Sequence, residues 1–278
     1  MRRFLVAAGV AVAITAAGCG STTANNTPAL DKVKLSAAEV LQQTAQKAEK
    51  VTSYTADIAM DMASPTGDSG NIQGSMRAQT SPKLAMDMTL DKISSGGQDI
   101  PGGMRMILNG DVAYLKMDML KQLMGGDKAW IKLDLKKLGA QSGLNMDELL
   151  GQANQMDMRT NIAMLTASKD VKQVGSEKVG GVDTTHFAGS YPLDAALKQL
   201  PAKTQEQLKG QLKGMKDMKF DVWIDGEGLP RKMVIKSDAG GQGTVDITMT
   251  FKSFNEKLEI TAPPASQIAE MPTNVPLG

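Results

Sequence analysis

The side chains that could act in catalysis are few in this 278-residue chain, and their spacing favours no reaction. His186 is the single histidine, so it is the obvious candidate for a general base near neutral pH. It lies in the run TTHF at 184–187, where strand alternation places it opposite Phe187, and no Gly-x-Ser-x-Gly motif accompanies it. We therefore interpret His186 as a strand residue that is hydrogen-bonded to a neighbour or exposed to water. An exported hydrolase would lack a base, and we expect no enzymatic activity.

Metal and cofactor chemistry also finds little support in the sequence. A zinc site requires several nitrogen or sulfur ligands, and one histidine with one cysteine cannot supply them. The carboxylate pairs Asp57/Asp61 and Asp147/Glu148 fall on outward-facing strand positions and in an exposed helical turn, where solvation is the ordinary state. We expect no metal site and no cofactor.

Cys19, the only cysteine, follows a segment with the features of a bacterial secretory signal. Basic residues at 2–3 precede an apolar run at 4–17, and the small residues AAG stand directly before the cysteine. This arrangement resembles a lipobox. In signals of that kind the peptide before the cysteine, here residues 1–18, is removed, the thiol takes a diacylglycerol, and the new amino terminus is acylated, for example with palmitate.

The alternatives for this segment are an ordinary signal or a membrane-spanning helix, but its apolar run is shorter than the roughly 20 residues that a span requires. Two or three acyl chains hold a protein at a bilayer more firmly than the single chain that binds reversibly. We therefore expect Cys19 to be the lipid anchor, with export by the general route. The mature protein should lie on the outer face of the cytoplasmic membrane, in the cell envelope.

The composition narrows the nature of the remaining chain. Residues 19–31 comprise the cysteine and a small, polar, proline-bearing tether, and we expect 32–278 to form a single domain. The net charge is +1 with both signs interspersed, which argues against a nucleic-acid partner. The 20 Met outnumber the 5 Phe, 3 Tyr and 2 Trp together, which indicates either an adaptable apolar surface or a lineage preference for methionine.

Periodicity predicts a helix followed by many strands. Ser36 and Glu39 form a capping box before an amphipathic helix at 37–51. The hydrophobic period then changes to two, and Asn109-Gly110 is a strong hairpin signal. Strands are predicted at 53–62, 72–78, 84–90, 104–109, 111–117, 128–134, 169–174, 182–191, 218–225, 230–237 and 243–254.

Two helical inserts interrupt these strands, one at 145–151 with 154–166, and one at 192–213 that Pro192 opens. Most strands alternate between apolar and polar residues, as antiparallel strands with one wet face do. We therefore predict an α+β fold in which a large curved antiparallel sheet is wrapped over helices. Trp130 and Trp223 fall on the polar sides of their strands, which is typical of a helix-covered edge or a surface that meets membrane headgroups.

Taken in order, these elements resemble the LppX/LprG-type lipoproteins of actinobacteria, relatives in fold of the lipid carrier LolA. The resemblance covers most of residues 30–272. It depends on the lipobox and tether, the capped first helix leading into SYTADIAMDM, the hairpin ILNGDVAYLK, the segment GGVDTTHF, and MKFDVWIDGEGLPRKM with the long strand after it.

The resemblance implies an incomplete barrel that encloses helices, with an apolar cavity for the acyl chains of a lipid or lipoglycan. It also implies a monomer that carries lipid between envelope membranes or to a membrane transporter. The alternative is a tethered adaptor or sensor domain with a closed core and no ligand. The candidate cavity residues are the apolar strand positions Ile58, Met60, Met62, Met76, Leu84, Met86, Met88, Ile131, Leu133, Phe220, Val222, Ile224, Val245, Ile247, Met249 and Phe251.

Overall fold

The computed structural model describes most of the chain from Leu35 onward, which falls in one compact unit, Leu35–Gly278. The predicted signal, Cys19, the tether and the helix expected at 145–151 lie outside the described residues. The described residues are 35–65, 67–117, 129–135, 157–200, 202, 205–206, 217–238 and 243–270.

Helix α1 (Ala37–Ala48) begins at the predicted capping box. The Ser36 hydroxyl accepts a hydrogen bond from the Glu39 amide at 3.3 Å, and the Glu39 carboxylate accepts one from the Ser36 amide at 2.7 Å. This exchange satisfies amides that the first helical turn leaves unpaired. The helix ends three residues earlier than predicted and buries one face, which carries Leu41 and Ala48.

Thirteen strands of the described residues form one sheet, and most of them match the predicted ranges. The strands are β1 (Ser53–Ala63), β2 (Ser69–Gln79), β3 (Ala85–Ser95), β4 (Gln98–Asp99), β5 (Met104–Asn109), β6 (Val112–Met117), β7 (Trp130–Asp134), β8 (Lys172–Val179), β9 (Val182–Pro192), β10 (Asp217–Asp225), β11 (Pro230–Asp238), β12 (Thr244–Phe254) and β13 (Ile268–Glu270).

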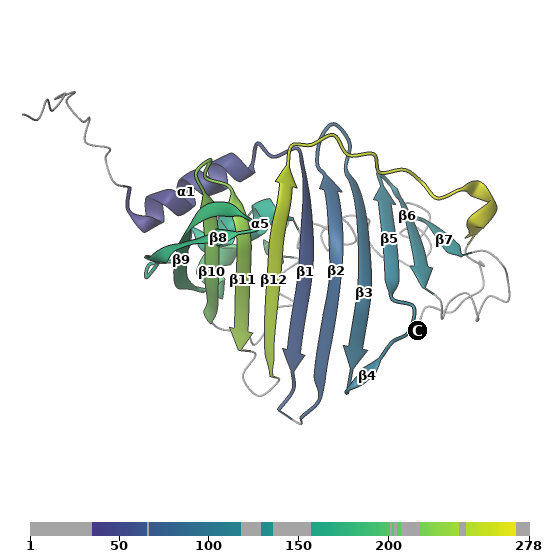
Figure 1. The fold of residues 1–278 in the computed structure, drawn as a ribbon, viewed down its shortest axis with the longest axis horizontal. Coiled ribbons are helices and arrows are strands. Elements are labelled where there is room, and N and C mark those ends of the chain that lie inside the picture. Colours follow the sequence, from purple (N-terminus) through teal and green to yellow (C-terminus); the bar gives the residue numbers. More distant parts are fainter. Residues whose placement is uncertain are drawn as a thin grey trace, which may run out of the picture. The chain divides into compact units, whose positions relative to one another are not determined.

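The strands are ordered β13-β7-β6-β5-β3-β2-β1-β12-β11-β10-β9-β8, and β4 pairs with β3 (Figure 1). Among the described residues β8 and β13 are the two edges, so the sheet is an incomplete barrel rather than a closed one. This confirms the predicted fold class. Strands β1 to β12 pair antiparallel, whereas β13 pairs parallel with β7 and corrects the expectation of a purely antiparallel sheet.

One strand differs clearly from its predicted range. Strand β8 runs from Lys172 to Val179 rather than from 169 to 174. The boundary was missed because this edge strand is largely exposed and shows little apolar alternation.

The turn Asn109-Gly110 joins β5 to β6 as predicted. Gly110 has a φ of +62°, which a residue with a β-carbon adopts only with strain.

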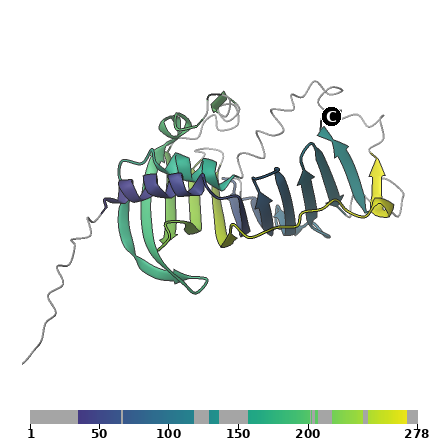
Figure 2. The same cartoon turned by 90° about the horizontal axis from the view of Figure 1, so that it is seen from above.

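The helical inserts appear as two short helices in the described residues. Helix α5 (Met158–Leu165) begins at Asp157, whose carboxylate accepts a hydrogen bond from the Arg159 amide at 2.8 Å. Helix α6 (Leu193–Leu197) directly follows β9, and Pro192 is its N-cap residue. Seen from above, α1, α5 and α6 lie on one side of the β8–β12 part of the sheet (Figure 2).

A second, smaller core forms on the opposite side of the other part of the sheet. After β12 the C-terminal segment crosses the ends of β1, β2, β3 and β5 and then pairs with β7 as β13 (Figure 1). Ile260 packs there with Tyr114 and Trp130 in a cluster of buried apolar residues. Strands β5 and β6 are therefore buried on the outer face by this cluster, while their inner-face residues Leu108 and Ala113 belong to the main core cluster.

Candidate functional site

The strand register assigns almost all of the predicted cavity residues to one face of the sheet, which we call the inner face. Met60 pairs with Ile247 and Ile58 with Met249 across β1 and β12. Because side chains alternate between faces and paired residues share a face, these pairs can be followed from strand to strand. The inner face carries Ile58, Met60, Met62, Met76, Met86, Met88, Ile131, Leu133, Phe220, Val222, Ile224, Val245, Ile247, Met249 and Phe251.

Leu84, the remaining predicted cavity residue, lies just before β3 begins. Its side chain is 38% exposed, and its carbonyl accepts a hydrogen bond from the Gly110 amide at 3.0 Å. The strand was predicted to begin at this residue, and the observed start at Ala85 leaves Leu84 in the connection from β2.

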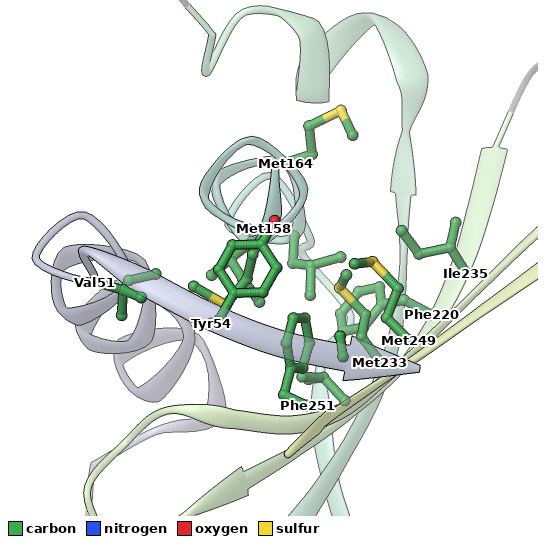
Figure 3. Packing of buried hydrophobic residues seen from close by; sticks show 14 of the residues in the cluster. Val51, Tyr54, Met158, Met164, Phe220, Met233, Ile235, Met249 and Phe251 are labelled. Carbon is green, nitrogen blue, oxygen red and sulfur yellow. The ribbon is translucent and has the colours of Figure 1, made fainter. Parts of the chain in front are cut away.

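Much of the inner face is filled by the helices. Phe220, Met233 and Met249 are each at most 5% exposed and belong to a core cluster that also contains Met158 and Ile162 of α5. Figure 3 shows Tyr54, Met233, Met249 and Phe251 of the strands gathered close to Met158 of α5. Burial of a side chain of this size stabilises the fold by about 1.5 to 3 kcal/mol, so this part of the face serves mainly as a hydrophobic core.

Another part of the inner face is only partly covered. One group lies where β1, β2 and β12 run farthest from α1, and a second group lies on β5, β6 and β7. We call these residues together the half-buried inner face. They are Met60, Met62, Ile72, Val245 and Ile247 in the first group, and Met104, Met106, Leu115, Met117, Ile131 and Leu133 in the second.

The inner face is also free of charge along most strands that the structure describes. At the paired positions of β1, β2, β5, β6, β7, β10 and β12 it carries no Asp, Glu, Lys or Arg. Charged residues of these strands, such as Asp57 and Lys132, lie on the outer face. An apolar surface without charge offers no ionic contact to a ligand.

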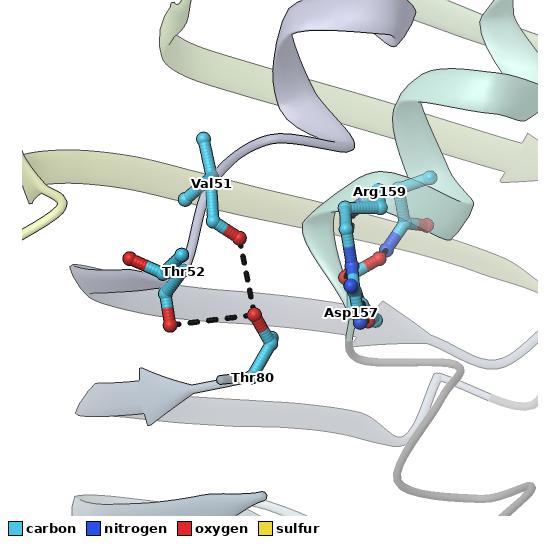
Figure 4. Close-up of polar contacts among 6 residues, drawn as sticks. Val51, Thr52, Thr80, Asp157 and Arg159 are labelled. Carbon is cyan, nitrogen blue, oxygen red and sulfur yellow. Dashed lines mark hydrogen bonds and ion pairs between the residues drawn. The ribbon is translucent and has the colours of Figure 1, made fainter. Parts of the chain in front are cut away.

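Polar contacts join the covered part of the face to α5. Tyr54 is 3% exposed and its hydroxyl is hydrogen-bonded to the backbone of Met158. Burial, followed by the negative charge of Asp157, raises the pKa of Tyr54, so its phenol stays neutral. Nearby, the Thr80 hydroxyl donates to the carbonyl oxygens of Val51 and Thr52, at 3.0 and 3.3 Å (Figure 4).

His186 is a structural residue of the outer face, as its sequence context predicted. Its Nε2 lies 2.9 Å from an Asp221 carboxylate oxygen, and its ring stacks on Trp223 with centroids 4.2 Å apart. The Trp223 indole donates a hydrogen bond to Glu177, and the Lys232 ammonium lies 4.6 Å from the Trp223 ring centroid. These contacts tie together neighbouring strands on the outer face.

The two tryptophans lie in neither of the predicted environments, a helix-covered edge or a surface that meets membrane headgroups. Trp223 is 8% exposed under His186 and Lys232, and Trp130 is 5% exposed beside Ile260 and under Arg105. Other side chains and the C-terminal segment cover them rather than a helix, and neither is exposed enough to meet headgroups. The cover comes from residues distant in sequence.

The paired carboxylate Asp57 is exposed as expected and forms an ion pair with Lys252 at 2.7 Å. Asp147 and Glu148 lie outside the described residues. Within the part of the chain that the structure describes, no cluster of three histidine, cysteine, aspartate or glutamate side chains could hold a metal ion. The same part contains no helix of the length and apolarity required to span a membrane.

Alternation alone could have identified several inner-face residues that were not predicted as site residues. Met104 and Met106 of β5 alternate with Arg105 in a strand that was itself predicted, and Leu115 of β6 follows the same pattern. The buried Tyr191 of β9 carried no such signal, because a tyrosine at a strand end is as typical of the surface.

The comparison with family models finds no match to this chain. An uncharacterized 31.2 kDa protein of Streptomyces griseus, described by its position in the rplA-rplJ intergenic region, is 29% identical over 143 residues. The match covers 49% of this chain and 45% of that protein, so it spans less than half the length of this relative.

The chain is similar to solved structures at low sequence identity. LprF from Mycobacterium bovis is 15% identical with a TM-score of 0.50, and the match covers 82% of this chain and 96% of LprF. The lipoprotein LppX from Mycobacterium tuberculosis is 16% identical with a TM-score of 0.46, over 81% of this chain and 98% of LppX. The likeness to LprF extends over nearly the whole of that structure and confirms the predicted fold.

Proposed function

From the premise that this chain has the fold of LprF, we propose that it is a lipoprotein of the LppX/LprG type that binds the acyl chains of a lipid or lipoglycan against its inner face. The observation that carries this proposal is the half-buried inner face, with its methionine and isoleucine side chains and no charge. A closed core would bury such residues fully, as it does Met233 and Phe220. The partial exposure of so many apolar side chains on one face is typical of a ligand surface.

The energetics of acyl chains suit a carrier. Each methylene gains about 0.8 kcal/mol when it moves from water to an apolar surface, so a long chain is held firmly. Relative to a bilayer it gains little, because both surroundings are apolar. Such a protein takes up and releases lipid at membranes at small net cost, and a partner such as a membrane transporter would supply the direction. Flexible methionine side chains adapt to chains of different shape.

The anchor completes this proposal. Acylated Cys19 would hold the protein at the outer face of the cytoplasmic membrane, and the tether at 20–31 would let the domain, as a monomer, reach lipid there. No residue of the domain is proposed to perform catalysis. The protein would act by binding and transfer alone.

The test blocks the half-buried inner face with bulky side chains. Met60 and Ile247 face each other across β1 and β12, so the double variant Met60→Trp/Ile247→Trp fills the space that an acyl chain would occupy. The matched control, Ala59→Trp/Thr248→Trp, changes the neighbouring pair on the outer face. Native mass spectrometry of each protein purified from its own host measures bound lipid.

Wild-type protein and the outer-face control should carry a heterogeneous set of lipids, and the inner-face variant should carry little while its circular dichroism spectrum stays unchanged. Wild-type protein that is free of lipid would contradict the proposal and favour a tethered adaptor or sensor. Equal lipid in both double variants would show that lipid binds elsewhere.

A further inference from the structure

One apolar row of paired side chains crosses five neighbouring strands of the inner face. We call it the acyl row, and from β12 through β1, β2 and β3 to the end of β4 it consists of Ile247, Met60, Ile72, Ile93 and Ile100. Its last step follows from the β3–β4 pairing, in which Ser94 lies opposite Asp99. The Ile100 amide donates to the Ile93 carbonyl at 2.8 Å, which continues that pairing by one residue. Because paired residues share a face, Ile100 lies on the inner face.

The acyl row is closed at one end and open at the other. Beyond Ile247 the same row continues to Ile235 and Phe220, which are 6% and 1% exposed in the core beneath the helices. From Ile247 to Ile93 the side chains are half-buried, and Ile100 is 39% exposed. A hydrocarbon chain along this row would therefore meet packed core at β11 and water at β4.

The two neighbouring rows of the inner face limit where such a chain can lie. On the side of the core the next row is buried, with exposed fractions of at most 9% for Met249, Ile58 and Leu90. On the other side the next row becomes polar toward β4 and ends with the exposed Ser95 and Gln98. The open end of the acyl row is thus bordered by side chains that can hydrogen-bond without carrying charge.

We propose that the acyl row holds one extended acyl chain, with its methyl end against Ile235 and its polar end beyond Ile100. This inference rests on the proposed function and names the length and direction of the bound chain. Four strand spacings of 4.8 Å make the row about 19 Å long. A zigzag of carbon–carbon bonds of 1.5 Å advances about 1.25 Å per carbon, so the row accommodates a chain of about 16 carbons.

The experiment compares two probes that differ only in chain length. The 16-carbon chain of 1-monopalmitoylglycerol would reach Ile100, whereas the 12-carbon chain of 1-monolauroylglycerol, about 14 Å long, would end one strand short of it. Displacement of a fluorescent fatty-acid analogue from the full-length protein in detergent micelles measures both affinities. Because each probe is compared between variants, its own preference for the micelle cancels.

Ile100→Ser should weaken binding of the 16-carbon probe by about 5-fold through the lost apolar contact, and change that of the 12-carbon probe by less than about 2-fold. Asp99→Ser is the matched control on the opposite face of the same short strand, and it should change neither affinity. Ile247→Ser, at the closed end, should weaken both probes, since both chains would lie there. Circular dichroism checks that each variant is folded.

Equal losses for the two probes in Ile100→Ser, or no loss for either, would overturn the acyl row while lipid binding itself would stand. A loss confined to the 16-carbon probe in Ile247→Ser would reverse the direction of the chain and also contradict the proposal. If wild-type protein binds neither probe and carries no lipid from its host, the proposed function is wrong and the acyl row falls with it.

Discussion

The two ends of the sheet differ in how completely each face is buried. At the end formed by β8 to β12, helices α1, α5 and α6 cover the inner face, while the outer face carries the polar contacts of His186 and Trp223. At the end formed by β5 to β7, the C-terminal segment covers the outer face around Trp130, while the inner face is half-buried.

This difference teaches how an apolar face can be left partly uncovered without loss of the fold. A sheet needs at least one buried face at each end to be stable. Strands β5 to β7 have a buried cluster around Ile260 and Tyr114 on the outer side. Their inner methionines are therefore only half-buried, and Met106 packs against the margin of the main core cluster.

The largest effect is expected where the inner face is a true core. Phe220→Ala should lower the free energy of unfolding by about 3 to 5 kcal/mol, because it leaves a cavity beneath the helices. Urea unfolding followed by circular dichroism measures this loss. A change below about 1 kcal/mol would mean that the helices do not form a packed core with β10.

A smaller and more local effect is expected from the outer-face core. Ile260→Ala should lower the free energy of unfolding by about 2 to 4 kcal/mol. The loss is smaller than for Phe220 because the Ile260 cluster contains few residues. Amide hydrogen exchange should accelerate in β5, β6 and β7 and stay unchanged in β9, β10 and β11. Uniform acceleration along the sheet would contradict the view that the two ends have separate cores.

The outer face near β3 and β5 gives a pH-dependent prediction. Burial would raise the pKa of Asp87, but hydrogen bonds from Arg105 and Arg77 outweigh it and hold that pKa below the ordinary value of 3.8. A carboxylate whose pKa is lower in the folded state stabilises the protein above the unfolded value, and this contribution is lost as the pH falls through the folded value. Stability should therefore decrease below about pH 4.

Asp87→Asn should cost about 1 to 3 kcal/mol at neutral pH, because two arginines lose their shared acceptor. It should also reduce the loss of stability at acid pH, which thermal melts between pH 3 and 7 would record. Asp57→Asn, at an exposed ion pair with Lys252, is the control and should change neither property by more than about 0.5 kcal/mol. If the Asp87 variant loses as much stability at acid pH as the wild-type protein does, Asp87 is not the cause of the decrease.

The smallest effect on stability is expected at the half-buried inner face. Met106→Ala should cost no more than about 1 kcal/mol, since the side chain is already partly exposed. If an acyl chain lies there, the same change should weaken lipid binding by about 5-fold through the lost apolar contact. A large loss of stability with unchanged binding would identify the residue as core and reverse the comparison between the two ends.

Much of the fold was readable from local signals. Ser36 and Glu39 determine the start of α1 because both hydrogen bonds form within one turn. The alternation of apolar and polar residues identified β1, β10 and β12, and it assigned their apolar side chains to one face, because side chains on a strand point alternately to its two sides. Strand β8 was harder, since an exposed edge strand lacks that alternation.

Other features depend on segments far apart in the chain. The parallel pairing of β13 with β7 joins residues more than a hundred positions apart, and no local pattern near Ile268 indicates it. Long-range packing also decides which face is buried at each end of the sheet. It likewise decides the burial of Trp130 and the lack of a partner for the Tyr191 hydroxyl in the described residues.

The amino-acid sequence by itself therefore determined the capped helix, nearly all of the strands and the face on which their apolar residues lie, because these follow from backbone geometry and nearest neighbours. Only the tertiary structure decided which of those apolar residues became core and which stayed half-buried. That outcome depends on where the helices and the C-terminal segment pack, and long-range packing is set by the whole chain at once.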